Sequence, residues 1–411
     1  MGCKVALGEI CSFSRGASVP RARMYDAGDF LYIHYGDLYR GFSLRVDVEA
    51  PQQTLPYISA EEKIRPEQFL EDQDIIYVLT SETVDDLGHA YLFNNPKKLP
   101  AVSGTETTIV RVCRQDVVVP AYLNYILQTA RFRAMLRQYV RGMKVFRVRP
   151  DDLACIEIDL PPLETQLKTV AFLDAVFEKQ LINNQINDYL AEYLKSCAKR
   201  LYREYERDEG ADLPEGWHWT TIGEISEMVC RGITPKYNDE SDELILGQTC
   251  IRNNLVLLEN GRLHAPRKIT EKWLKKYDLL INSTGVGSLG RTAQVWFNPS
   301  KLVVDSHVTI VRAADPRHAL YMGFWAFEHE RYIESLHTGS TGQTELPRNH
   351  VKAIRLVLPS DTELEKFNAV AQPTVDLIVA NQKESKRLAE LRDTLLPKLM
   401  SGEIDVSSVA I

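Results

Sequence analysis

The sequence predicts an α+β protein with two globular domains in a pseudo-two-fold repeat, separated by two long helices that form an antiparallel coiled coil. Its 411 residues exceed the length of one ordinary domain. Short motifs recur in the same order about 200 residues apart, and each copy precedes a long stretch with apolar residues at helical spacing. We therefore expect a first domain at 1–160, a central helix at 161–207, a second domain at 208–360 and a C-terminal helix at 361–411.

The repeat rests on five matches between the two halves of the chain. They are Leu7-Gly8-Glu9-Ile10 with Ile222-Gly223-Glu224-Ile225, Arg15-Gly16 with Arg231-Gly232, Asp74-Ile75-Ile76 with Asp278-Leu279-Leu280, Thr108–Arg111 with Thr309–Arg312, and Ile156–Pro161 with Ile354–Pro359. Each match alone is weak. Chance does not explain five of them in one order, so the sequence predicts two copies of one fold.

Each domain is followed by a stretch with apolar residues three and four positions apart, which indicates one apolar helix face. The first stretch runs from about Leu163 to Tyr205 and the second from about Thr362 to Met400, where Pro373 should kink or divide the helix. Asn184-Gln185 and Asn381-Gln382 interrupt the apolar pattern as residues that fix helix register do. Each helix could instead pack on its own domain, but the repeat favours a pair.

Charge and composition narrow the function classes. The net charge of −7 does not favour a DNA-binding protein, yet most of the acidic excess lies in the two helical segments, and DNA needs a basic surface only locally. The seven cysteines form no CxxC pair and the nine histidines no HxxxH pair, so we expect reduced thiols and no metal site. The sequence has no apolar run of membrane length and no signal-peptide pattern, and we expect a cytoplasmic protein.

Several motifs together resemble the DNA-specificity subunits of type I restriction–modification systems. The second copy begins Leu213-Pro214-Glu215-Gly216-Trp217-His218-Trp219 and runs into Ile222–Ile225, as that family's recognition domains begin. The stretches 339–359 and 160–166 resemble the ends of such domains, and 391–404 is similar to the family's closing helix. The order of domain, helix, domain and helix also matches.

The resemblance implies a non-catalytic DNA-binding subunit with two target-recognition domains, each reading one half of a bipartite double-stranded target. It also implies that the paired helices set the spacing and dock two methyltransferase subunits, and that restriction/translocase subunits join them. It implies no cofactor and no membrane partner. The first domain departs from the pattern because it begins at Leu7-Gly8-Glu9-Ile10 without the tryptophan-rich lead-in.

The strongest local signal for DNA contact is a basic run without any acidic residue. It contains Arg131, Arg133, Arg137, Arg141, Lys144, Arg147 and Arg149, interleaved with Phe132, Tyr139 and Phe146. Clustered cations gain affinity by displacing counterions from phosphates, and arginine can also read guanine with two hydrogen bonds. A solvated helix face would usually mix in acidic residues, so we expect this run to contact DNA.

In the second domain the candidates are more dispersed. A loop of small hydroxyl and amide side chains could contact phosphates or adenine edges, followed by two basic residues: Ser340, Thr341, Gln343, Thr344, Arg348 and Lys352. An ordinary surface loop explains it about equally well. Further basic residues are Arg262, Arg267, Lys268, Lys272, Lys275 and Lys276.

Two alternatives belong to other function classes. Gly285-Val286-Gly287-Ser288-Leu289-Gly290 satisfies the GxGxxG pattern of a nucleotide-dependent enzyme, but a strand-like run follows it, so we expect a tight hairpin. A coiled-coil adaptor that binds only proteins would not need the basic run. The sequence contains no phosphate-binding loop, methyltransfer tetrapeptide or convincing nuclease carboxylate cluster, so we assign no catalytic residue. Base choice depends on side-chain geometry, and the sequence does not give the DNA target.

Overall fold

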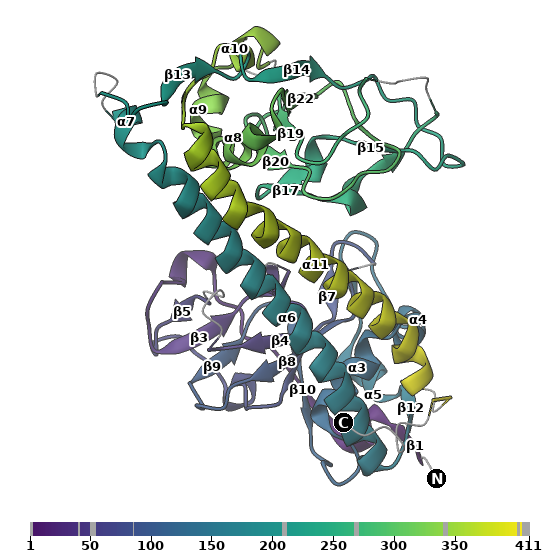
Figure 1. Ribbon diagram of the computed structural model, residues 1–411. Coiled ribbons are helices and arrows are strands. Elements are labelled where there is room, and N and C mark those ends of the chain that lie inside the picture. The colour runs from purple at the N-terminus through teal and green to yellow at the C-terminus, as the bar shows by residue number, and fades with distance from the viewer. Residues whose placement is uncertain are drawn as a thin grey trace. The chain divides into compact units, whose positions relative to one another are not determined.

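The computed structural model describes residues 3–39, 42–49, 55–84, 86–207, 212–266, 271–339, 344–400 and 403–404. It contains two compact units, each with strands and short helices together with part of both long helices. The first unit comprises Met1–Lys179 and Arg387–Ile411, and the second comprises Gln180–Lys386. Figure 1 shows this mixture of strands and helices. The predicted class, a repeated α+β fold with two long helices, is confirmed.

The first unit contains one larger sheet and three smaller ones. The larger sheet has the order β2 (Cys11–Arg15), β10 (Thr107–Val112), β6 (Ile75–Val78), β8 (His89–Asn94) and β4 (Arg45–Asp47). The smaller sheets are β5 (Tyr57–Ile58), β3 (Phe30–Ile33) and β9 (Ala101–Ser103); β1 (Cys3–Ala6) and β12 (Glu157–Leu160); and β7 (Thr80–Ser81) and β11 (Phe146–Arg147). The helices are α1 (Leu7–Ile10), α2 (Tyr35–Leu38), α3 (Pro120–Gln128), α4 (Ala130–Arg137) and α5 (Pro150–Ala154).

The second unit repeats this plan. Its main sheet has the order β14 (Ser226–Arg231), β22 (Val308–Ala313), β19 (Leu279–Asn282) and β20 (Thr292–Gln294). The smaller sheets are β18 (Arg262–Leu263), β15 (Leu244–Leu246) and β21 (Leu302–Val304); β13 (His218–Thr221) and β23 (Arg355–Leu358); and β16 (Ile251–Arg252) and β17 (Leu255–Val256). The helices are α7 (Arg203–Arg207), α8 (Pro316–Glu328), α9 (Glu330–Ser335) and α10 (Arg348–Lys352). Strand β14 therefore corresponds to β2, β22 to β10, β19 to β6 and β21 to β9.

A buried ion pair explains two of the five sequence matches. In the first unit Arg111 donates from Nε and Nη2 to the two carboxylate oxygens of Asp74, at 2.9 and 2.7 Å. In the second unit Arg312 donates to Asp278 with the same geometry, at 2.7 Å for both contacts. Both aspartates are almost fully buried. Burial raises the pKa of Asp74, and the hydrogen bonds from Arg111 oppose that rise.

The repeated glycines mark places without room for a side chain. A Cβ atom on Gly16 would lie 1.9 Å from the carbonyl oxygen of Gly104. One on Gly232 would lie 2.1 Å from the carbonyl oxygens of Val304 and Asp305. The Arg-Gly pairs therefore end β2 and β14 at the same tight crossing of the chain, next to the loop that enters β10 or β22.

The two long helices are α6 (Leu163–Arg200) and α11 (Asp361–Met400), and they lie side by side in Figure 1. Within the second unit Asn381 donates from Nδ2 to Oδ1 of Asn187 at 2.9 Å, and Gln180 donates from Nε2 to the carbonyl of Ser385 at 2.8 Å. From Gln180 to Asn187 on α6 the contacted residue on α11 changes from Ser385 to Asn381. Residue numbers therefore rise along one helix and fall along the other, so the two helices are antiparallel. Asn183, which is buried, donates to Glu384 at 2.8 Å. The register-fixing role predicted for Asn184-Gln185 thus falls to the neighbouring Asn183 and Asn187.

Pro373 was expected to kink or divide the second helix; α11 continues through this residue, so it is not divided there. Proline in a helix interior costs about 3 kcal/mol because it removes a hydrogen bond and crowds the preceding turn. Ala371 and Val375, on either side, are fully buried in the hydrophobic core of the second unit. Burial of residues on both sides of the proline opposes that local cost.

The apolar positions of α6 are not all covered. Leu173, Leu194 and Ala198 are completely buried. Other apolar side chains of this helix are more than one third exposed: Leu167, Leu181, Ile182, Ile186, Tyr189 and Tyr193. The sequence predicted one buried apolar face per helix. On α6 part of the apolar side chains is buried as predicted, and the other apolar side chains are exposed. Among the helices of the described ranges, none combines the length and the hydrophobicity needed to span a membrane.

Candidate nucleic-acid interface

The basic run predicted to contact DNA divides between a helix and a hairpin. Arg131, Arg133 and Arg137 lie on α4. After this helix the chain turns at Gly142, whose φ of 113° suits glycine, and the backbones of Arg141 and Arg147 pair at 2.9 and 2.8 Å. Strand β11 in this hairpin pairs with β7. The hairpin thereby holds the second half of the run against the end of the main sheet.

The helical half of the run contacts other parts of the protein. Arg131 lies 3.4 Å from Asp159. Arg133 is half-buried. The pKa of His89 is lowered first by the burial of that histidine and second by the positive charge of Arg133. Arg137 is exposed and also has a partner within the chain. Arg131 and Arg137 therefore have partners within the protein, and Arg131 borders a cavity of about 50 Å³, much smaller than the groove at the hairpin.

The hairpin half borders a groove of about 690 Å³ in the first unit. Its lining includes four arginines, one acid and several hydroxyl groups: Arg15, Arg141, Arg147, Arg149, Glu106, Ser18, Thr80, Thr105, Thr107 and Thr108. Arg141 contacts Asp152 at 3.2 Å, and Arg147 lies 4.0 Å from Glu106. Arg15 and Arg149 make no side-chain hydrogen bond or ion pair within the described part of the chain. We call this cavity the first groove; it carries an excess of positive charge.

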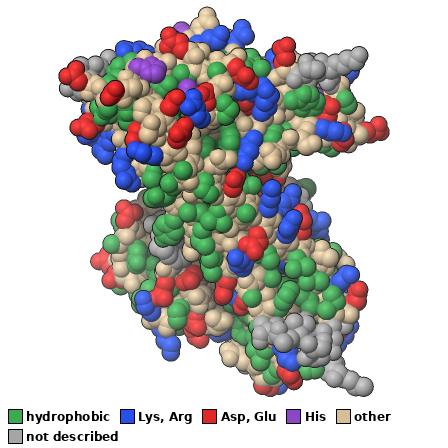
Figure 2. Space-filling view, in the orientation of Figure 1, with side chains coloured by type: hydrophobic (Ala, Val, Ile, Leu, Met, Phe, Trp, Pro, Cys, Tyr) green, Lys and Arg blue, Asp and Glu red, His purple; other side chains and the backbone are tan. Residues whose placement is uncertain are grey.

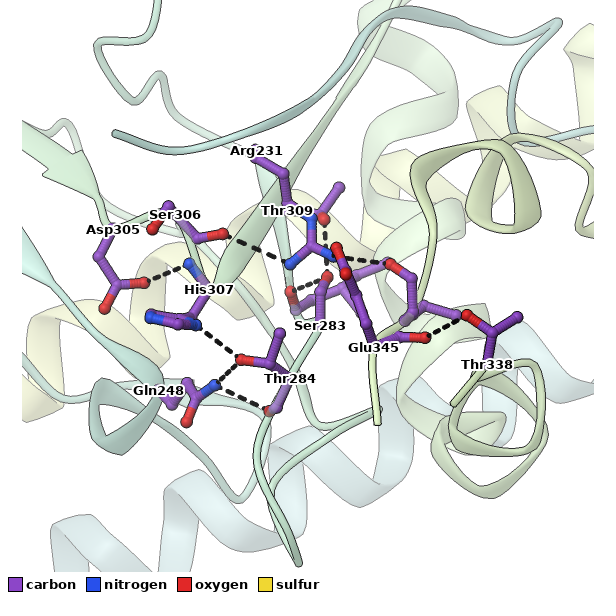
Figure 3. A network of polar contacts seen from close by, with 12 residues as sticks. Arg231, Gln248, Ser283, Thr284, Asp305, Ser306, His307, Thr309, Thr338 and Glu345 are labelled. Carbon is purple, nitrogen blue, oxygen red and sulfur yellow. Dashed lines mark hydrogen bonds and ion pairs between the residues drawn. The ribbon is translucent and has the colours of Figure 1, made fainter. Parts of the chain in front are cut away.

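The second unit has a polar network at the equivalent place, drawn in Figure 3. Arg231, which corresponds to Arg15, donates from Nη2 to Oε1 of Glu345 and to the carbonyl of Leu346, both at 2.8 Å. Its Nη1 donates to the carbonyl of Ser306 at 3.4 Å. The guanidinium of Arg231 is therefore occupied by protein acceptors, and its side chain is 15% exposed.

Beside Arg231 lies a chain of neutral hydrogen-bonding groups (Figure 3). Gln248 donates from Nε2 to the carbonyl of Thr284 at 2.8 Å and also contacts its hydroxyl. Thr284 Oγ1 and His307 Nδ1 lie 2.8 Å apart, and the backbone amide of His307 donates to Asp305 at 2.8 Å. Burial raises the pKa of Asp305, while the His307 amide opposes that rise.

Gln248, Asp305 and His307 of this network also border a cavity of about 230 Å³, the second groove. Its lining includes Tyr237, Gln248, Thr249, Asn260, Arg262, Asp305 and His307. The guanidinium carbon of Arg262 lies 3.4 Å from the ring centroid of Tyr237, a cation–π contact. Compared with the first groove, this one offers amide, hydroxyl and imidazole groups in place of most of the arginines.

Part of the predicted loop of the second domain lies outside the described residues: Ser340, Thr341 and Gln343. Thr344 is half-buried, and Arg348 and Lys352 are exposed on α10. Of the dispersed basic residues, Arg262 borders the second groove, while Arg267 and Lys268 are outside the described ranges. Lys272 donates to the carbonyl of Gly232 at 3.0 Å, and Lys275 and Lys276 lie 3.5 and 2.8 Å from acidic residues.

The sequence prediction missed Arg15, Thr284, Gln248 and His307 as site residues. One signal was available for Arg15 and its counterpart, because the Arg-Gly pair recurs in both halves. The others come from loops far apart in the chain, and nothing in their local sequence marks them. Arg15, Thr284 and His307 lie at strand ends that share one edge of the main sheet, after β2 and β19 and before β22. Gln248 joins Thr284 from the chain that follows β15 of the smaller sheet.

The glycine motif at Gly285–Gly290 lies in the loop of an antiparallel hairpin between β19 and β20. The hairpin is as predicted, but its connection, 283–291, is longer than the tight turn expected. Gly285, Gly287 and Gly290 have φ values of 95°, 74° and 84°, which other residues rarely adopt. No helix begins in the motif, so it lacks the geometry by which a dinucleotide fold presents a helix N-terminus to phosphate. Among the described side chains, no three histidines, cysteines, aspartates or glutamates form a group suited to hold a metal ion.

The sequence model of the type I restriction modification DNA specificity domain matches residues 3–192. The chain is 23% identical over 314 residues to the type I restriction enzyme MjaIX specificity subunit of Methanocaldococcus jannaschii, which covers 72% of this chain and 71% of that protein. It is 22% identical over 199 residues to the HindI specificity subunit of Haemophilus influenzae, covering 47% and 42% of the two chains.

The fold is similar to the crystal structure of a type I restriction-modification system S subunit from M. genitalium. The TM-score is 0.60 at 14% sequence identity, and the match covers 97% of this chain and 96% of that one. At this identity the likeness concerns the fold. It matches the order of two repeated domains and two long helices described above.

Proposed function

The chain belongs to the specificity subunits of type I restriction–modification systems, and on that premise we propose that each of its two units reads one half of a bipartite target in double-stranded DNA. We take 1–160 and 208–360 as the two target-recognition domains, and 161–207 and 361–411 as the helices that set the spacing of the half-sites. As a specificity subunit the chain is the non-catalytic component. We propose that methyl transfer and cleavage belong to its partners and that the complex acts on DNA in the cytoplasm.

One observation carries the proposal: in both units a groove with a polar lining borders the loop that enters the corresponding strand of the main sheet, β10 in the first unit and β22 in the second. A bipartite target requires two readers of similar build and different side chains. The two units meet this requirement, because they have the same strand order and their grooves have different linings. The arginines of the first groove suit phosphates and guanine edges, and Gln248 in the second suits adenine.

The exposed side of α6 supports a role in docking the methyltransferase subunits. Ile182, Ile186, Tyr189 and Tyr193 follow one another at steps of four, three and four residues and therefore form one stripe. Their exposed fractions are 48, 39, 77 and 49%. Figure 2 shows hydrophobic side chains gathered along the part of the surface where α6 runs. Large exposed apolar patches mark interaction sites. We propose that two methyltransferase subunits dock on the helices and that restriction/translocase subunits join that complex.

The test is a comparison of adenine methylation across the genome in cells with and without this chain. We expect one bipartite motif to be methylated only when the chain is present. The purified chain alone should neither methylate nor cut DNA, and it should gain sequence-specific binding when its methyltransferase partner is added. Methyl transfer by the chain alone, or an unchanged methylation pattern in its absence, would refute the proposal.

A further inference from the structure

The repeat allows the two units to be compared position by position at this edge of the sheet, because backbone pairing fixes which residues correspond. Arg15 pairs with Thr108 and Arg231 with Thr309, so Arg15 corresponds to Arg231. Arg147 pairs with Thr80, as Glu345 does with Thr284. The corresponding residues at this edge are therefore Arg15 and Arg231, Arg147 and Glu345, Arg141 and Thr338, and Glu106 and His307. All four first-unit residues border the first groove, whereas of their counterparts His307 borders the second.

The residue that corresponds to Arg147 in the first unit and Glu345 in the second decides whether the arginine common to both units, Arg15 or Arg231, can contact a ligand. In the second unit Glu345 accepts a hydrogen bond from Arg231 at 2.8 Å, and the carbonyls of Leu346 and Ser306 bind the same guanidinium. In the first unit the corresponding residue is Arg147, which carries the same charge as Arg15 and cannot accept a hydrogen bond. Arg15 makes no side-chain contact with an acceptor in the described chain and borders the open first groove.

From this comparison we infer that the residue at the position of Arg147 and Glu345 determines how each unit reads DNA. In the first unit it leaves Arg15 free to contact guanine in the major groove, with Arg147 beside it. In the second unit Glu345 holds Arg231 in the protein, and the bases are read by Gln248, Thr284 and His307. The inference rests on the proposed function and adds to it the specificity-determining residues and the kind of base that the first unit reads.

The chemistry supports this assignment of roles. A free guanidinium presents two parallel donors that match O6 and N7 of guanine, and this pairing is the most frequent specific contact between arginine and DNA. A guanidinium already bound by a carboxylate and carbonyl oxygens has few donors left for a base. Neutral amide, hydroxyl and imidazole groups can both donate and accept, and they suit adenine and other base edges.

The experiment uses the complex of the full chain with its methyltransferase partner. Its probes are DNA duplexes that carry the methylated motif of wild-type cells, each with one base pair replaced. The measured quantity is the ratio of the affinities for the native and the replaced duplex at each position. Arg15→Ala and Arg147→Glu should both lower this ratio at a guanine of one half-site, from about 5- to 150-fold to near one. Gln248→Ala should lower the ratio in the other half-site only.

Arg114→Ala is the matched control, because Arg114 is an exposed arginine of the same unit that neither borders the first groove nor belongs to the basic run predicted to contact DNA. It should leave every ratio unchanged. The unaffected half-site also reports folding, since an unfolded variant would lose discrimination in both halves. Unchanged ratios at all guanines in the Arg15→Ala complex would overturn the inference while leaving the proposed function intact. Complete loss of binding to all duplexes by Arg15→Ala would also overturn it. A wild-type complex without any half-site discrimination would instead refute the proposed function.

Discussion

The basic hairpin of the first unit should contribute a measurable share of the salt dependence of DNA binding. The perturbation is the triple change of Arg141, Lys144 and Arg149 to alanine. All three residues are exposed, and Arg141 and Arg149 border the first groove. The ion pair of Arg141 with Asp152 lies at the surface, where such pairs contribute about 0–1 kcal/mol, so the fold should tolerate the change.

The magnitude follows from counterion release. Each phosphate contact contributes about 0.9 to the slope of log affinity against log salt concentration, so three contacts contribute about 2.7. Between 50 and 200 mM salt the affinity of the wild-type complex should therefore fall about 40-fold more than that of the variant. Fluorescence anisotropy with a labelled duplex, measured at five salt concentrations, gives both slopes directly.

A second triple change, Lys97, Lys98 and Arg114 to alanine, removes the same charge from the opposite end of β9 and β10. None of these residues borders the first groove. This control should lower the slope much less than the hairpin variant does. Equal slopes for the wild type and the hairpin variant would place the hairpin away from DNA. If the two variants lose the same amount of slope, the effect of the hairpin change is explained by net charge alone.

Three further predictions concern stability, assembly and spacing. Asp278→Asn should destabilise the second unit by about 3 kcal/mol because it removes the buried partner of Arg312 and leaves this guanidinium only the half-exposed carboxylate of Glu227, 3.8 Å away; hydrogen exchange should rise in β19 and β22 and stay unchanged in β6 and β10. Changing Tyr189 and Tyr193 to glutamine should weaken binding of the methyltransferase subunit about 30-fold in an equilibrium binding assay, since exposed tyrosines are frequent hot spots, and Glu192→Gln on the same helix should not. Deleting Asn187–Leu190 shortens α6 by about 6 Å and slightly more than one turn; the methylated motif should lose one or two base pairs of spacer and keep both half-sites, and altered half-site bases with an unchanged spacer would contradict the spacing role.

The long-range plan of the fold could be predicted because its signals are local and repeated. Apolar residues at helical spacing predicted α6 and α11 to within a few residues, and the recurring motifs predicted two copies of one domain. The hairpin around Gly285–Gly290 followed from the strand-like residues after the motif, although its loop is longer than expected. In each case the residues that carry the signal are neighbours in the chain, or are copies of such neighbours.

The site could be predicted only in part because it is assembled from loops far apart in the chain. The basic run is continuous in sequence, but α4 directs its first arginines toward Asp159 and the region around His89, while the hairpin brings Arg147 to the groove. Arg15 reaches the same groove from the end of β2. Charge clustering in sequence does not reveal which face of a helix is buried. It also cannot show that Glu345 will meet Arg231.

The repeat indicates why the reading residues can differ while the fold stays the same. The positions that the two units share are buried or sterically restricted. Breaking the Asp74–Arg111 pair would leave a buried charge at a cost of about 3–5 kcal/mol, and a side chain at Gly16 would collide with the backbone. An exposed position such as Arg147 carries no such cost, since surface changes usually alter stability by about 0.5 kcal/mol or less. A groove lined by exposed residues can therefore change its DNA target by single substitutions while the domain stays folded.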